Sequence, residues 1–283
     1  AEAAVPLLRR DVARAALVID DDYTRALRRG EPAPVQLLVD GADNSTAAVA
    51  MGYASAIAIG RVEVPGGLPY AVRSRALFNP ALRSTIFIIP GLMALILVIV
   101  AVMLTALTVA REYERGSMEQ LFATPTRRVE IILGKLAPYF VLGLVQVLLV
   151  LTAGVTLFDL PVRGSLLLLF GVASLFLLAM LGQGLLISVV TRSQMLASQV
   201  AVITTLLPAL LLSGFIFPIE HMPLPLRVLA NVFPASHLVE ALRAILLRGN
   251  GPAAVAADCG AIAAFFALML ALSIKRFQRV VGA

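Results

Sequence analysis

The sequence is poor in the residues that a soluble domain of its size needs. Only 14% of its 283 residues are charged, Trp is absent, Cys occurs once, and 60% of residues are hydrophobic, which gives a mean hydropathy of +0.93. The lone Cys259 excludes an internal disulfide framework and any multi-cysteine metal site. We expect it to serve as a small apolar residue of a helix. Because so little polar surface cannot cover a soluble globule of this length, the sequence predicts a membrane protein.

Motifs for catalysis and nucleotide binding are also missing. No phosphate-binding loop of the form G-x-x-x-x-G-K-[ST] occurs, since Gly134-Lys135 lacks both the upstream Gly and the following hydroxyl. The motifs G-x-S-x-G and H-E-x-x-H are absent too, which weakens an interpretation as a membrane-embedded hydrolase. The formal charge of +6 is not gathered into a basic run with interleaved aromatics. We therefore expect no enzyme activity, no bound cofactor or metal, and no nucleic-acid partner for this chain.

Long apolar runs without charge are abundant from Ile86 onward. A helix that crosses the hydrocarbon core needs about 20 apolar residues. Lipid-exposed strands would require a closed barrel and an alternating pattern that these runs lack. The sequence therefore predicts a predominantly α-helical, polytopic membrane region, 86–283, with five spans at 86–110, 136–158, 165–190, 196–217 and 253–274.

Residues 1–85 differ from the rest, with ten Arg and nine acidic residues. Short β-type runs at 15–19 and 35–39 alternate with helix signals that end near Gly30 and Ile59, and further extended segments are expected near 61–64 and 70–77. This pattern predicts a small α/β domain. The triplet Asp20–Asp22 is expected to cap the first of these helices, with cation binding as the alternative.

Basic residues in the connections predict the orientation of the spans. Nine Lys and Arg lie in the loop 111–135, the loop 191–195 and the tail after Ile274, against four in the connections of the other side. The positive-inside rule therefore puts the loop 111–135 and the C-terminus in the cytoplasm, and residues 1–85 outside. An outer N-terminal domain needs an export signal or an anchor, so we expect a further span upstream, six in total.

The polar stretch 111–128 lies between two uncharged runs and is the most informative segment. Ser117 and Gln120 have the spacing of a capping box, so a short helix is expected from Ser117 to about Ala123. Met118, Leu121 and Phe122 would form one apolar stripe on it. The pattern fits either a helix that docks in the groove of a soluble partner or a helix that lies on lipid headgroups.

Several strings of the chain resemble type-2 ABC transporter permeases, the group that includes bacterial multidrug and lipid-linked exporters. REYERGSMEQLFATPTRRVEIILGKLAPY resembles their first cytoplasmic loop, and LLSGFIFPIEHMPLPLRVLANVFPASHLVEALRAILLRG, residues 211–249, resembles their outer hairpin, expected here at 218–252. VIDDDYTRALRRG, LLVDGADNSTA and RALFNPALRSTIFIIPG resemble the extracytoplasmic domain of the drug-exporter branch. The resemblance covers most of the chain and keeps the order of its elements.

The resemblance implies a permease subunit of an ATP-driven exporter in the bacterial inner membrane. Its partners would be ATPase subunits that carry ATP and magnesium, a second permease as homodimer or heterodimer, the lipid bilayer, and an envelope partner at residues 1–85. The substrate would be hydrophobic or amphipathic. The alternative is a sensor or scaffold that transports nothing. By position, the residues that would couple the permease to the ATPase are Glu112, Glu114, Arg115, Gly116, Ser117, Met118, Glu119, Gln120 and Leu121.

Polar residues inside the predicted spans are further candidates. Inter-helix hydrogen bonds explain most of them, and a transport route is the alternative for Gln183, Gln199, Thr204 and Thr205. Asp258 is expected to reach the outer interface rather than carry protons. His221, His237 and Glu240 have the chemistry of a metal site, but an ordinary ion pair between Glu240 and Arg243 competes with it.

Overall fold

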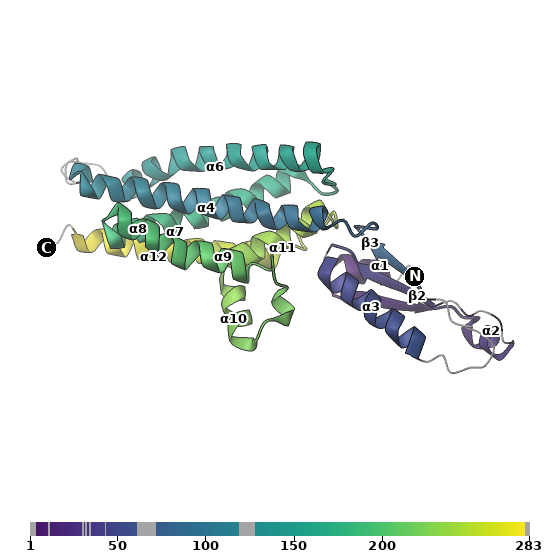
Figure 1. Cartoon of the computed structure of the whole chain (residues 1–283). Helices are drawn as coiled ribbons and strands as arrows, with labels where there is room; N and C mark the ends of the chain where they lie inside the picture. The colour runs from purple at the N-terminus through teal and green to yellow at the C-terminus, as the bar shows by residue number, and fades with distance from the viewer. Residues whose placement is uncertain are drawn as a thin grey trace.

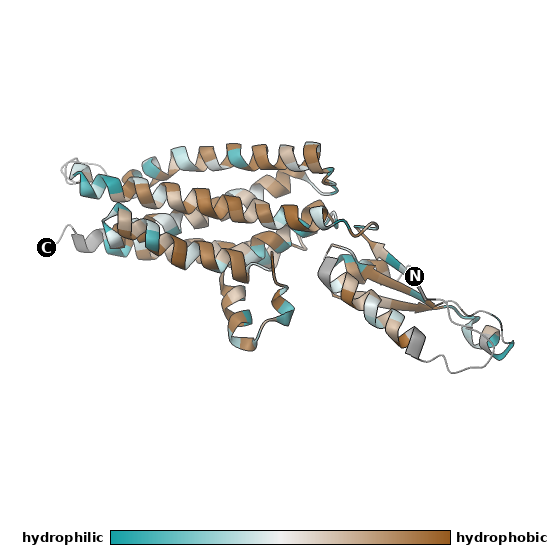
Figure 2. Cartoon of the chain, viewed as in Figure 1, coloured by the Kyte–Doolittle hydropathy of each residue, from teal (hydrophilic) through white to brown (hydrophobic). Residues whose placement is uncertain are grey.

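The computed structural model describes residues 4–10, 12–29, 31, 33, 35–42, 44–60, 72–118 and 128–280. Figure 1 shows two parts, an elongated bundle of helices and a small α/β domain beyond one end of it. Figure 2 shows that the length of the bundle is mainly apolar and that polar residues gather towards its ends, as expected of helices that cross a membrane.

The α/β domain is a three-stranded sheet with helices. The middle strand, β2, pairs antiparallel with β1 and parallel with β3, in the registers Ala15↔Val39 and Val35↔Val72. Leu37 and Val39 of β2 pack on Ala47 of the following helix, which closes a small core. The predicted strands at 15–19 and 35–39 are present, the first helix was not predicted, and the segment 61–64 lies outside the described residues. The elements are α1 (Ala4–Arg9), β1 (Ala15–Ile19), α2 (Tyr23–Arg29), β2 (Val35–Asp40), α3 (Asn44–Gly60) and β3 (Val72–Leu77).

Five helices of the described chain are long and apolar enough to cross a membrane, which confirms the predicted polytopic fold. The first three are single helices, the fourth span is built from three consecutive pieces, and short helices connect it to the fifth. The elements are α4 (Ser84–Glu114), α6 (Arg128–Phe158), α7 (Leu166–Thr191), α8 (Gln194–Ala201), the π-helix η1 (Val202–Leu206), α9 (Leu207–Leu212), the 3₁₀ turn η2 (Ile219–His221), α10 (Leu224–Val232), α11 (Pro234–Leu246) and α12 (Ala256–Val280).

Helix α7 forms the centre of the bundle and packs against α4, α6, α8, α11 and α12. It approaches α4 closely at Gly184, where an added Cβ would lie 2.7 Å from the carbonyl oxygen of Val102, so no larger residue fits. In the 18-residue apolar stretch of each helix, 56% of the residues are buried in α4 and in α7, against 22% in α6. Helix α6 therefore turns most of its leucines and valines outward, where lipid would cover them.

The fourth span ends earlier than predicted, at Leu212 rather than at residue 217. Gly214 takes a left-handed φ of 73°, and Pro218 follows four residues later, so the helix cannot continue. Apolar composition alone concealed this break, because Phe215 to Phe217 remain hydrophobic. The bend returns the chain towards α11, whose Arg243 Nη2 donates to the carbonyl oxygen of Gly214 at 3.1 Å.

The bundle has two distinct ends in Figure 1. At the domain end lie the α/β domain, the start of α4 and the helix α11. At the loop end lie the last turn of α4, the start of α8 and the C-terminal part of α12.

Candidate functional site

At the loop end, the last turn of α4 is bonded to two neighbouring helices. Glu112 forms an ion pair with Lys135 of α6. Two residues later, Glu114 Oε1 accepts a hydrogen bond from the backbone N–H of Gln194, the first residue of α8, at 2.7 Å, and its other oxygen accepts from the Gln194 side chain. Arg111 Nε donates to Gln194 Oε1 at 3.1 Å. A displacement of this turn would therefore pull on α6 and α8 together.

The chain leaves α4 through Gly116, which has a φ of 71°, a conformation that L side chains avoid. The hydroxyl of the next residue, Ser117, donates to the carbonyl oxygen of Glu112 at 3.2 Å and so satisfies one of the open carbonyls at the helix end. Gly116 thus forms a bend at the end of α4. The capping-box partner Gln120 lies outside the described residues, as do Glu119, Leu121 and Phe122.

Met118 differs from its expected place on an exposed apolar stripe. Its side chain is 1% exposed, and its sulfur lies 3.5 Å from Lys135 Nζ, so it packs into the bundle beneath that side chain. The apolar side chain belongs to the same core cluster as Leu136 and Ile132 of α6. Met118 therefore offers no contact surface in this conformation, whereas Glu114 and Arg115 stay exposed.

The four candidate route residues divide between two environments. Gln183 of α7 is buried, and its Nε2 donates to Thr205 Oγ1 at 2.8 Å and to the carbonyl oxygen of Thr204 at 3.5 Å. Pro208 lacks the N–H that would bond this carbonyl in a regular helix, so Gln183 stands in for it. The side chains of Gln199 and Thr204, by contrast, are exposed. The four residues therefore do not line one surface of the chain.

The bonds of Gln183 fall at η1, the single π-helical turn of the bundle's described part. There, the N–H of Leu207 bonds to the carbonyl oxygen of Val202, five residues earlier. Such turns interrupt the regular bonding of a helix and are frequent at functional sites. Of the two interpretations offered for polar residues inside the spans, inter-helix hydrogen bonding explains the positions of Gln183 and Thr205.

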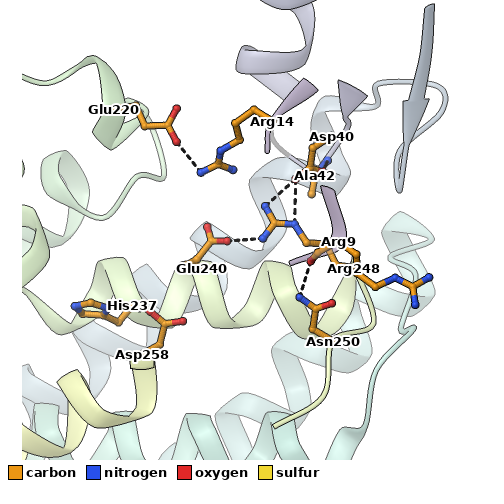
Figure 3. Close-up of polar contacts among 10 residues, drawn as sticks. All are labelled: Arg9, Arg14, Asp40, Ala42, Glu220, His237, Glu240, Arg248, Asn250 and Asp258. Carbon is orange, nitrogen blue, oxygen red and sulfur yellow. Dashed lines mark hydrogen bonds and ion pairs between the residues drawn. The ribbon is translucent and has the colours of Figure 1, made fainter. Parts of the chain in front are cut away.

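At the domain end, a buried ion-pair network ties the α/β domain to the bundle (Figure 3). Asp40, the last residue of β2, accepts hydrogen bonds at its Oδ2 from Arg248 Nε at 3.1 Å and Nη2 at 2.8 Å. The third nitrogen of the same guanidinium, Nη1, donates to Glu240 Oε1 of α11 at 2.7 Å. The side chains of Asp40 and Arg248 are 1% and 2% exposed, so water screens this pair little.

Two further contacts cross the same interface. Arg14 Nη2 pairs with Glu220 Oε1 at 2.7 Å at the outer rim, and Asn250 Nδ2 donates to the carbonyl oxygen of Arg9 at 2.9 Å. Burial opposes ionisation of Glu240, but the positive charges of Arg248, Arg243 and Arg14 outweigh it and lower its pKa. The arginines at this interface therefore keep the carboxylate charged.

His237 and Asp258 join α11 to α12. His237 Nδ1 lies 2.9 Å from Asp258 Oδ1, and its Nε2 lies 2.8 Å from the carbonyl oxygen of Asn231. Both partners are acceptors, so the ring bonds both only when doubly protonated. The hydrogen bond to Asp258 accordingly raises the pKa of His237, against the opposing effect of burial. Asp258, in the first turn of α12, is thus bonded to a neighbouring helix. Within the described residues, no cluster of three His, Cys, Asp or Glu side chains could hold a metal ion.

Residues 2–275 match the family described as ABC-2 family transporter protein. The chain belongs to the ABC-2 transporter family. The probable multidrug ABC transporter permease YbhS of Escherichia coli K12 is 42% identical over 84% of this chain and 66% of its own length. The permease YbhR of the same organism is 33% identical over 80% and 63% of the two chains. The inner membrane transport permease YhhJ is 31% identical over 94% and 73%. The aligned part of the chain thus spans just under two thirds of the length of the first two relatives.

Sequence reasoning missed the partners of the domain end. In the sequence Asp40 is only a polar residue after a strand and Arg248 only a basic residue of a connection, and 207 residues separate them. No local pattern links two such positions. Lys135 was likewise counted only for its charge, although its spacing from Glu112 across a reversing loop would have allowed a pair between antiparallel helices.

Proposed function

We propose that this ABC-2 family member is the permease subunit of an ATP-driven exporter whose ATP hydrolysis takes place in a separate ATPase subunit. The observation that carries the proposal is the bonding of the last turn of α4. Glu112 and Glu114 connect it to α6 and α8, next to an exit bend at Gly116. A soluble partner that moves the loop after Gly116 would thereby move three spans at once. A two-state bundle needs such a partner to bias its equilibrium.

The proposed orientation puts the loop end in the cytoplasm and the domain end outside. The excess of Lys and Arg at the loop end supports it. The position of the C-terminal part of α12 at that same end fits it as well (Figure 1). In this orientation Glu112, Glu114, Arg115, Gly116 and Ser117 lie at the cytoplasmic end. We assign them, with Glu119, Gln120 and Leu121 of the following loop, to the coupling with the ATPase subunits, which would bind ATP and magnesium. Met118 acts as an internal support for the loop, since it is buried against α6.

The proposed substrate is hydrophobic or amphipathic, and a second permease subunit would complete the transport route. The similarity to YbhS and YbhR, both described as probable multidrug ABC transporter permeases, supports this substrate class. The exposed face of α8 and η1, with Gln199 and Thr204 among apolar residues, is the surface that we assign to the second subunit. A polar side chain there would find a partner in another protein more readily than in lipid.

The test uses the full-length protein assembled with its ATPase subunits in proteoliposomes. Glu114→Ala removes the bonds to Gln194, so we expect normal membrane insertion and complex assembly but a loss of ATP-dependent transport of a lipophilic dye. ATP hydrolysis should continue without stimulation by the dye. Lys275→Gln, an exposed substitution at the same end of the bundle, is the matched control and should change neither quantity.

Two results would contradict the proposal. Unchanged dye transport in Glu114→Ala would show that the bond between α4 and α8 does not carry the coupling. Repeated purification of the full-length protein without any ATPase subunit would instead favour a sensor or scaffold, in which the outer domain binds a ligand and no transport occurs.

A further inference from the structure

A cavity of about 340 Å³ lies at the domain end, between the α/β domain, the bend after α9, and the helices α10, α11 and α12. This volume is large enough for a polar headgroup but small for a whole lipid. Guanidinium groups and carboxylates line it, together with small and apolar residues of the bend. Nothing in the proposed coupling at the loop end uses this cavity.

Most charges around the cavity are balanced by protein groups. Arg248 is bonded to Asp40 and Glu240, and the pair of His237 with Asp258 is also balanced. Arg14 pairs with Glu220 at the mouth, where the two side chains are 31% and 48% exposed. A ligand anion could therefore replace Glu220 as the partner of Arg14 at little cost, because exposed ion pairs are weak.

Arg227 of α10 lies at the mouth of the cavity without a carboxylate partner among the described residues. Its side chain is exposed at the cavity, and its guanidinium donates to the backbone carbonyl of Glu220. Asn231 lies one helical turn further along the same face and also lines the cavity. The mouth of the cavity thus offers one uncompensated positive charge beside an amide, which suits a single anionic group.

An apolar stripe runs along α10 beside this polar face. Leu224, Val228 and Val232 follow one another at intervals of four residues and are 74%, 55% and 65% exposed. They lie about 80° around the helix from Arg227 and Asn231, given about 100° per residue. A molecule with its charged group at Arg227 could lay an apolar chain along this stripe.

We propose that the cavity binds the headgroup of an anionic amphiphile of the outer leaflet, with its apolar chain on the stripe of α10. Arg227 and Arg14 hold the anionic group, and Asn231 donates a hydrogen bond to it. The inference deepens the proposed function, because it names the charge of the amphiphile that the permease handles. Its binding step needs neither ATP nor the ATPase subunit.

The experiment places the purified full-length protein in phosphatidylcholine nanodiscs that contain graded amounts of a phosphatidic acid with a photoactivatable acyl chain. We expect saturable labelling of α10, identified by mass spectrometry and competed by unlabelled phosphatidic acid. Arg227→Gln should weaken the apparent affinity by roughly tenfold or more, since it removes a charge-assisted hydrogen bond. Arg75→Gln, which changes an exposed arginine of β3 away from the cavity, is the matched control and should leave labelling unchanged.

Three outcomes would overturn the proposal. Labelling that never saturates would show an ordinary lipid contact, and competition by inorganic phosphate as effective as that by phosphatidic acid would show a site for a free anion. Equal labelling of the wild type and of Arg227→Gln would show that the headgroup does not bind at Arg227 in the cavity. Because no nucleotide is present, none of these results bears on the coupling at the loop end.

Discussion

The two ends of the bundle are held together by different kinds of interaction. At the domain end, Asp40 and Arg248 form a nearly water-free pair that joins the α/β domain to the bundle. At the loop end, the contacts of Glu114 with Gln194 are exposed to water. A buried pair cannot lose one partner without leaving a stranded charge, whereas exposed contacts break and form at little cost. The pair of Asp40 and Arg248 is therefore harder to break than the contact of Glu114 with Gln194.

The substitution Arg248→Ala tests the domain end most severely. It leaves Asp40 buried and uncompensated and Glu240 without its hydrogen-bonded partner, so we expect a destabilisation of about 3–5 kcal/mol. Thermal unfolding of the full-length protein in detergent measures this loss, with Arg75→Gln as the control. An unfolding temperature equal to that of the wild type would show that the network does not hold the two parts together.

Gly116→Ala tests the loop end by backbone strain alone. An added Cβ at this position meets no atom within 4 Å, but the φ of 71° is unfavourable for Ala by about 1–2 kcal/mol. We expect a small loss of overall stability and a large loss of dye-stimulated ATP hydrolysis in the assembled complex. Gly134→Ala, at a glycine within α6 that also has open space around it, is the control for the loss of a glycine. Full stimulation in Gly116→Ala would mean that the bend is not needed for coupling.

Gln183→Leu tests how much the hydrogen bonds in the middle of the bundle contribute to stability, compared with the interactions at its two ends. It removes the donor to Thr205 and to the carbonyl that Pro208 leaves open, so we expect a destabilisation of about 0.5–1.5 kcal/mol. The measurement is the shift of the thermal unfolding curve in detergent. Gln199→Leu changes an exposed glutamine of α8 and should cost less in the isolated chain. A reversed order of the two costs would contradict the assigned bonding.

The pair of His237 and Asp258 adds a pH dependence to the domain end. The pKa of His237 is raised in the folded protein by the hydrogen bond to Asp258. Its stabilising contribution is therefore complete below the unfolded pKa of about 6.5 and is lost as the pH rises through the folded value. We expect the difference in unfolding temperature between wild type and His237→Gln to shrink between pH 5.5 and pH 9. A difference that grows with pH would contradict the charged pair.

Much of the fold could be predicted because it depends on local composition. The five spans follow from runs of apolar residues, and the strands at 15–19 and 35–39 follow from short β-type runs between turn residues. The first helix of the α/β domain and the early end of the fourth span could not be predicted in the same way. Phe215 to Phe217 are as hydrophobic as the helix before them, and only the backbone at Gly214 reveals the break.

The candidate sites were less predictable than the fold. A bend at Gly116 agrees with the backbone freedom of a glycine at a helix end, whereas the burial of Met118 depends on Lys135 and the core of α6. Arg248 and Asp40 meet only because the strand β2 ends against the turn after α11. Gln183 was correctly marked as a polar residue inside a span, but its bond to the carbonyl that Pro208 leaves open depends on the packing of α7 against the fourth span.

The sequence by itself determined that this chain is a polytopic membrane protein with a small α/β domain. Whether a segment can cross the membrane depends on the hydrophobicity of that segment, so local composition predicts the spans. Only the tertiary structure decided which charges are paired, which helix ends are linked, and where a cavity remains at the domain end. Those features depend on distances between residues far apart in the chain, and such distances are set by the packing of whole helices and not by any local pattern.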